Sequence, residues 1–211
     1  MTAVTSKCPN CGAPVTFRWS QSVQTTCAFC SSVIVRHDVD LERMGSVGLV
    51  PAGNSPIQIG TEGMWRDKAF TVTGRIVYEY ENGSWNEWHL ILTGGASAWL
   101  SDAQSEYALS RLVEKPGDIP NRQAVRRGQH YPLAGEAFEV MTLTRAHYRG
   151  VEGELPFEYW DKTDALFVDL RATSGTFATI DYSEEPPLVF VGELAEFGDL
   201  RLRNLRQIEG W

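Results

Sequence analysis

The sequence predicts a mostly β chain, in which a small cysteine-bearing module precedes two related antiparallel β meanders. Three observations lead to this fold class. The 211 residues include seven Trp, seven Tyr and nine Phe, and aromatic residues favour strands over helices. Apolar and polar residues alternate along many short segments, which is the period of a half-buried strand. All four cysteines fall within the first thirty residues, where they form two pairs.

The four cysteines have the spacing of a tetrahedral metal site. They occur as Cys8-Pro-Asn-Cys11 and Cys27-Ala-Phe-Cys30, with fifteen residues between the pairs. Two residues between thiolates let one tight turn aim both sulfurs at the same ion, and Gly12 supplies the positive φ that such a turn often needs. We therefore predict a zinc ribbon, with these four cysteines as the ligands of Zn²⁺.

Two alternatives to a structural zinc site are weaker. Disulfides need an oxidising compartment, and residues 1–7 show no basic segment followed by an apolar one, so we expect a cytoplasmic protein. A redox dithiol uses a single C-x-x-C, normally within a βαβ pattern. Because four thiolates fill the coordination shell, we expect the zinc to be structural and His37 to be a surface residue.

The charge distribution argues against nucleic acid as a partner. The net charge is −8, and residues 1–44 carry four basic and three acidic residues, a net of +1 that leaves −9 on residues 45–211. Nucleic-acid binding through the ribbon would need a basic stripe, which is missing. No apolar run approaches the ~20 residues of a membrane span, so we expect no transmembrane segment.

The chain divides at a segment rich in Gly, Pro and Ser. We predict the zinc ribbon over residues 1–43, this linker over 44–58, and a duplicated β domain over 59–211. Within the β domain, matching residues recur in order, first at an offset of 68 residues and then at 80, which indicates an internal duplication. The matches include Gly60 with Gly128, Ala69 with Ala137, Phe70 with Phe138, Tyr80 with Tyr148, Gly95 with Gly175 and Ala98 with Ala178. The predicted units are repeat one over about 59–115, a connector over 116–127 and repeat two over about 128–211.

Each repeat is expected to form an antiparallel meander of four to five strands. Residues 101–114 have the propensity of a capped helix, but the equivalent stretch contains Pro186 and Pro187, which a helix interior excludes, so we predict a strand in both copies. The alternation over residues 200–205 predicts a last strand. Whether the meanders form one small barrel, a sandwich or two small domains stays open. The expected strands lie near 70–80, 87–93, 97–101 and 107–113, and near 138–148, 164–171, 176–181 and 187–192.

Enzyme signatures are missing from the sequence. It contains no G-x-S-x-G, P-loop, G-x-G-x-x-G or H-E-x-x-H motif, and its four histidines are scattered without ligand or catalytic spacing. We therefore assign no catalytic residue and expect a protein that is not an enzyme.

An aromatic segment offers a first candidate surface for a ligand or partner. Trp85 and Trp88 lie on opposite faces of the expected strand, with Glu87 between them. An exposed Trp beside a carboxylate can bind a cation or an amine through a cation–π contact. Packing in the β core is the alternative role for these aromatic residues, and we favour it.

An acidic segment in the insertion of the second repeat offers a second candidate surface for a ligand or partner. Glu152, Glu154, Glu158 and Asp161 lie close together in sequence and could hold a cation or polyamine. Their spacing does not match a metal-binding loop, so we favour a solvated loop. Insertions in one copy of a repeat are nevertheless where function tends to lie.

A set of aromatic and acidic motifs makes roughly residues 57–205 similar to a bacterial family of unknown function, numbered 4178. The motifs are Trp85-x-Glu-Trp88-x-Leu90, Trp99-Leu100, Glu152-Gly-Glu154-Leu-Pro156, Val168-Asp169-Leu170 and Thr179-Ile180-Asp181-Tyr182. Members of this family often carry an N-terminal zinc ribbon, and no activity or catalytic residue is established for it. The resemblance implies a link to membrane-associated stress proteins and to polyamine metabolism, near whose genes such members are encoded. Where the family often has Glu after Trp-Leu, this chain has Ser101-Asp102, so Asp102 is the one candidate for that acid.

These observations favour a non-enzymatic, cytoplasmic binding or scaffold protein with a structural zinc ribbon and a protein partner of unknown identity. The alternative is a cleft between the two repeats that binds a cationic or amine ligand, or acts on it. That cleft would use Glu87, Asp102 or the acidic residues between 152 and 158.

Overall fold

The computed structural model describes residues 4–37, 40–46, 55–158 and 164–208. It confirms a mostly β fold, because the regular elements of the described residues are fifteen strands and one short 3₁₀ helix, η1 (Phe197–Leu200). Within the part of the chain that the structure describes, no helix has the length and apolar character that a membrane crossing requires.

The N-terminal module consists of two small antiparallel sheets. One sheet pairs β1 (Val4–Lys7) with β2 (Pro14–Phe17), and the other contains β3 (Gln24–Thr26), β4 (Ser32–His37) and β5 (Asp40–Ser46). β5 extends past the predicted boundary at residue 43, and residues 47–54 of the predicted linker lie outside the described residues. We call this module the ribbon.

The remaining ten strands form one large antiparallel sheet. In chain order they are β6 (Glu62–Trp65), β7 (Lys68–Tyr80), β8 (Gly83–Leu92), β9 (Ser97–Ala103), β10 (Glu106–Leu112), β11 (His130–Leu133), β12 (Glu136–Gly153), β13 (Ala165–Ala172), β14 (Thr176–Asp181) and β15 (Leu188–Ala195). The sequence pattern predicted eight of these strands near their observed positions. The predicted strand over residues 200–205 is wrong, because η1 begins at Phe197 and only Arg203 forms an isolated bridge, with Glu62.

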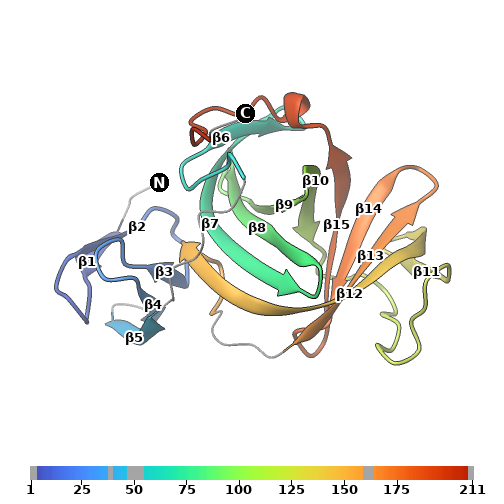
Figure 1. Cartoon of the computed structure of the whole chain (residues 1–211), viewed down its shortest axis with the longest axis horizontal. Coiled ribbons are helices and arrows are strands. Elements are labelled where there is room, and N and C mark those ends of the chain that lie inside the picture. Colours follow the sequence, from blue (N-terminus) through green and yellow to red (C-terminus); the bar gives the residue numbers. More distant parts are fainter. Residues whose placement is uncertain (1–3, 38–39, 47–54, 159–163, 209–211) are drawn as a thin grey trace.

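Eight of these strands close into a ring. β7 to β10 form one meander, β12 to β15 form another, and the two join where β10 pairs with β15 and where β12 pairs with β7. The two short strands lie outside the ring of pairings: within the sheet, β6 pairs only with the first residues of β7, and β11 only with the first residues of β12. Long, bent β12 crosses from the second meander to the first and ends beside the ribbon (Figure 1). Of the architectures left open by the sequence, the pairing is that of a single barrel.

The two meanders follow the same strand order. Each begins with a short strand that pairs with a long one, and three more strands follow. This correspondence agrees with an internal duplication, which stays a prediction about the history of the chain.

The strands have two differently lined faces. One face carries two apolar clusters: the first contains Trp88, Leu90 and Leu100, and Ile57 packs into it; the second surrounds Phe138. The opposite face of the same strands carries a third cluster, which draws residues from both meanders. There Trp85 of β8 contacts Phe167 of β13 with ring centroids 5.3 Å apart. Because β8 and β13 are not neighbours in the sheet, this second face turns inward, and we call it the inward face.

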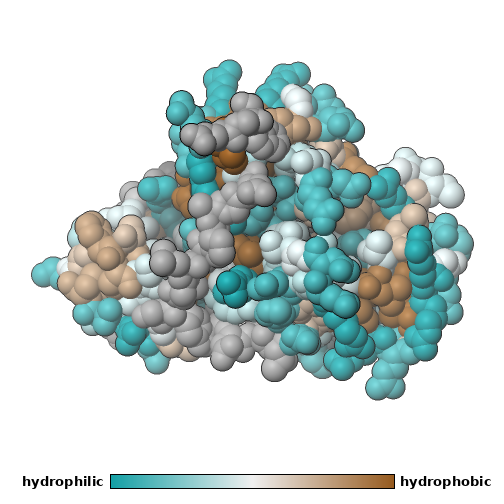
Figure 2. All heavy atoms as spheres, viewed as in Figure 1, coloured by the Kyte–Doolittle hydropathy of each residue, from teal (hydrophilic) through white to brown (hydrophobic). Residues whose placement is uncertain are grey.

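In the view of Figure 2, hydrophilic atoms cover much of the ring, with a hydrophobic group at the end that carries β11 to β13, and a second hydrophobic group lies over the ribbon. Phe29 in the second cysteine turn is 71% exposed and Val4 is 50% exposed. Neither residue belongs to the core of the ribbon, which consists of Cys8, Val15, Phe17, Cys27 and Ile34.

Candidate functional site

The four cysteines converge at one end of the ribbon. Their sulfur atoms all lie within 4.8 Å of one another, with Cys8 Sγ 3.7 Å from Cys30 Sγ and Cys11 Sγ 3.8 Å from Cys27 Sγ. A tetrahedral ion with metal–sulfur bonds of about 2.3 Å separates its thiolates by roughly 3.8 Å, so the sulfur positions fit a zinc ion.

Two similar turns aim these sulfurs. The Gly12 N–H donates to the Cys8 carbonyl and the Ser31 N–H donates to the Cys27 carbonyl, both at 2.9 Å. Gly12 and Ser31 both have positive φ, at 76° and 55°, as the turn geometry requires. Four thiolates would close the coordination shell and leave no position for a reacting water. His37 lies elsewhere, 3.2 Å from the carboxylate of Glu42.

Glu154 fastens the ribbon to the ring. It follows β12 directly, is 5% exposed, and its carboxylate accepts hydrogen bonds from the backbone N–H groups of Arg18 and Trp19 and from Ser22 Oγ at 2.6 Å. The next residue, Leu155, exchanges backbone hydrogen bonds with Gln24 of β3. A buried carboxylate is costly unless donors surround it, and here the ribbon supplies them.

An aromatic contact runs beside this anchor. The indole of Trp19 lies 5.2 Å from the imidazole of His89, whose centroid is 5.0 Å from that of Trp99 in β9. The Trp19 Nε1–H also donates to the Gly95 carbonyl at 3.1 Å. His89 is fully buried, and burial lowers its pKa to about 4, so its neutral ring belongs to the packed interface.

A pocket of about 810 Å³ opens on the inward face. Both meanders and the ribbon line it, and its walls are largely aromatic. Its charged lining contains one basic residue, Arg111, and five acidic ones. We call it the inward pocket. The aromatic residues are Trp19, Tyr78, Trp99, Phe157, Phe167 and Phe190, and the acidic ones are Glu87, Glu114, Asp181, Glu184 and Glu185.

Glu87 is a half-buried acidic group of the inward pocket. Its carboxylate accepts hydrogen bonds from Trp85 Nε1 at 2.9 Å and from Ser101 Oγ at 2.8 Å. Burial, with a smaller contribution from the charges of Asp169 and Asp181 across the ring, raises the pKa of Glu87 to about 8. The carboxyl is therefore largely protonated at neutral pH, and a cation placed beside it would favour its ionised form.

Asp169 is a second enclosed acid near Glu87. It lies in β13 and accepts hydrogen bonds from Thr142 Oγ1 and Thr179 Oγ1, both at 2.8 Å. Burial raises its pKa, whereas the two threonine hydroxyls lower it. Three acids from β8, β13 and β14 thus approach one another across the ring.

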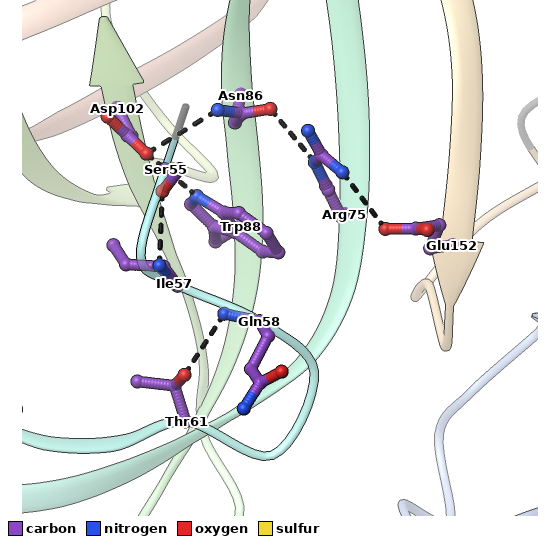
Figure 3. A network of polar contacts seen from close by, with 9 residues as sticks. All are labelled: Ser55, Ile57, Gln58, Thr61, Arg75, Asn86, Trp88, Asp102 and Glu152. Atoms are coloured by element: carbon purple, nitrogen blue, oxygen red, sulfur yellow. Dashed lines mark hydrogen bonds and ion pairs between the residues drawn. The ribbon is translucent and has the colours of Figure 1, made fainter. Parts of the chain in front are cut away.

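A separate polar network lies on the opposite face of the sheet (Figure 3). Arg75 is 2% exposed, donates to Asn86 at 2.8 Å and to the Glu152 carboxylate at 3.1 Å, and lies over the Trp88 ring. The Asn86 amide and Trp88 Nε1 both point at Asp102, at 3.4 Å. This network neutralises a buried arginine within the fold.

The residues predicted as a ligand or partner surface thus fall into separate places. Trp85 and Glu87 lie together on the inward face, and Trp88, Asp102 and Glu152 belong to the arginine network. Glu154 anchors the ribbon, and Glu158 is exposed. Asp161 lies outside the described residues. The structure does not bring the acidic segment together as one cluster.

Sequence reasoning missed Asp169, Asp181 and Trp19 as lining or neighbours of the inward pocket. A signal for Asp169 was present, because a carboxylate between Val168 and Leu170 interrupts an apolar strand. Nothing local marked Trp19, which reaches the pocket only through the docking of the ribbon.

Comparison with known proteins identifies the β region. The model of the family described as Domain of unknown function (DUF4178) matches residues 58–196, which include all strands of the ring and exclude the ribbon. No curated protein and no solved structure matches the chain.

Proposed function

Since the chain belongs to the DUF4178 family, whose description assigns no activity, we propose from the geometry that it is a non-enzymatic binding protein that takes a cationic, amine-bearing ligand into the inward pocket. The ribbon is proposed to be a structural zinc module of this binding protein.

One observation carries this proposal, the combination of aromatic walls and acidic groups in the inward pocket. Six aromatic side chains and five carboxyl groups line a space of about 810 Å³, which is the size range of small-molecule sites. A cation over an aromatic face gains about 0.5–2 kcal/mol, and more where water is excluded. An anionic ligand would instead face five acidic residues and one arginine.

The polar groups in the pocket suit binding. They are mostly hydroxyls and carboxyls, together with Gln21 and Arg111, and among the described residues that line it there is no histidine or cysteine. An ammonium group beside Glu87 would displace its proton and form a charge-assisted hydrogen bond with it. A polyamine has this chemistry and agrees with the systems that the family resemblance implies. Four reduced cysteines agree with a cytoplasmic location.

Calorimetric titration with matched ligands tests the proposal. Phenethylammonium and spermidine are titrated into the zinc-loaded protein, with phenethyl alcohol as the uncharged control. We expect both cations to bind at least tenfold more tightly than the alcohol. Equal affinity for the amine and the alcohol would overturn the proposal.

Two variants locate the site. Glu87→Gln removes the carboxylate from the pocket, whereas Glu106→Gln makes the same change on an exposed residue outside it. We expect amine binding to be about tenfold weaker in Glu87→Gln and unchanged in Glu106→Gln. A protein partner, as expected for a scaffold, is sought by affinity purification of the same zinc-loaded protein.

A further inference from the structure

We infer that the inward pocket is a composite site, in which the ribbon segment 18–22 forms one wall and metal in the cysteine site holds that wall in place. The inference rests on the proposed ligand pocket, but it concerns which residues build that pocket and what keeps them there.

The first step is the position of Trp19. Trp19 and Gln21 line the inward pocket together with Trp99 of the ring, although they precede the ring in sequence. Trp19 is 4% exposed, and its ring packs on His89 while its Nε1–H donates to the Gly95 carbonyl. Removal of this side chain would open the pocket to solvent on the ribbon side.

The second step is the anchor. Three donors of segment 18–22 point at the single carboxylate of Glu154, which is not a lining residue of the pocket. Breaking a buried, charge-assisted set of hydrogen bonds costs more than breaking neutral ones. The wall therefore depends on the ribbon keeping the backbone of Arg18 and Trp19 in register with Glu154.

The third step is the dependence of the ribbon on metal. The core of the ribbon contains five buried residues, and two of them, Cys8 and Cys27, are predicted ligands. A core of this size does not stabilise a module alone, and in such modules metal binding supplies the folding free energy. Segment 18–22 lies between β2, which follows the turn of Cys11, and β3, which precedes the turn of Cys27, so the metal would fix the chain on both sides of the wall.

The resulting expectation is metal-dependent ligand binding without any contact between ligand and metal. The four sulfurs coordinate the ion, Glu154 holds the segment, and Trp19 meets the ligand. Loss of any one of the three should weaken binding, although only Trp19 touches the pocket.

Calorimetry with phenethylammonium separates these roles. We expect at least tenfold weaker binding after zinc is removed with a chelator, and a similar loss in Trp19→Ala, with recovery in Trp19→Phe. Phe29→Ala is the matched control, because Phe29 is an exposed aromatic residue of the same ribbon that is not among the residues lining the pocket. Unchanged affinity in both the zinc-free protein and Trp19→Ala would overturn the inference.

Glu154→Gln keeps the inference testable if the zinc-free protein loses its fold. This variant retains all four cysteines and every lining residue of the pocket. We expect one zinc per chain, as in the wild type, together with weaker phenethylammonium binding. Wild-type affinity in this variant would contradict a role for the anchor.

Hydrogen exchange distinguishes failure of the inference from failure of the proposed ligand. On zinc removal we expect faster amide exchange at residues 154–157 and 92–99 of the ring, as well as in the ribbon. Changes confined to the ribbon would overturn the composite site even if amines bind. Faster exchange in the ring without any amine binding would instead contradict the proposed ligand and leave the composite site supported.

Discussion

Trp19 of the ribbon packs on His89 of β8, with ring centroids 5.2 Å apart and ring planes inclined by 53°. This contact joins a segment between two cysteine turns to a strand of the ring that lies seventy residues further along the chain. The ribbon and the ring therefore form one packed unit.

Metal content provides the first prediction. We expect the purified protein to contain one zinc per chain by elemental analysis, because the sulfur geometry fits a single tetrahedral ion. Cys27→Ser should abolish stoichiometric binding and lower the melting temperature. Ser20→Ala, at an exposed ribbon residue outside both cysteine turns, should keep its zinc. The assignment would be contradicted if the purified wild type contained no metal and if adding zinc left its melting temperature unchanged.

The second prediction concerns the contribution of Glu87 to the pH dependence of folding stability. The pKa of this group rises from 4.5 to about 8 on folding. Between these values the folded state holds a proton that the unfolded state has released, so stability is highest at the acidic end and is lost as pH rises toward 8. Glu87→Gln should flatten this decline in urea unfolding curves between pH 5 and 8. An unaltered slope, relative to Glu106→Gln, would argue against the enclosed carboxyl.

His89 provides a third prediction, with the opposite sign. Its pKa falls from 6.5 to about 4 on folding. Between pH 6.5 and 4 the unfolded state binds a proton that the folded state excludes, so this contribution to stability is lost as pH falls. His89→Gln should reduce the acid-dependent loss of melting temperature over that window, whereas His130→Gln, at an exposed site, should not.

Gly192 provides the fourth. It pairs with Ser110 of β10 and with Phe177 of β14, and a Cβ at this position would overlap the Leu109 carbonyl. Gly192→Ala should therefore lower the free energy of unfolding by about 1–3 kcal/mol or more, because the junction of the two meanders must shift. Gly198→Ala is the control, since a Cβ there meets no atom within 4 Å. Equal unfolding curves for the two variants would refute the tight junction.

The sequence was informative where the signal is local. The cysteine spacing indicated the ribbon, and period-two alternation located eight strands, because both depend on neighbouring residues. The alternation over residues 200–205 misled for the same reason. Leu200 and Leu202 cover the apolar cluster around Trp88 from a 3₁₀ turn and the segment after it, which buries them without strand pairing.

The candidate site could not be assembled in this way, because it depends on distant contacts. Glu87 was singled out beside Trp85, but its approach to Asp169 arises only when the ring closes. Glu154 was predicted as part of an acidic loop, and its partners lie more than one hundred residues earlier. Charge alone gave no indication that backbone N–H groups of another module would surround it.

Closure of the ring also bears on how the chain reaches its native state. β7 finds β12 through pairs such as Gly74 with Gly153, and β10 finds β15 through pairs such as Leu112 with Phe190. Such long sequence separations slow folding, because loop-closure entropy is lost before the contacts form. During synthesis the first meander emerges with the outer edge of β10 bare, and with that of β7 bare beyond its pairing with β6. A nascent chain must keep both edges from pairing with other chains until the second meander has been made.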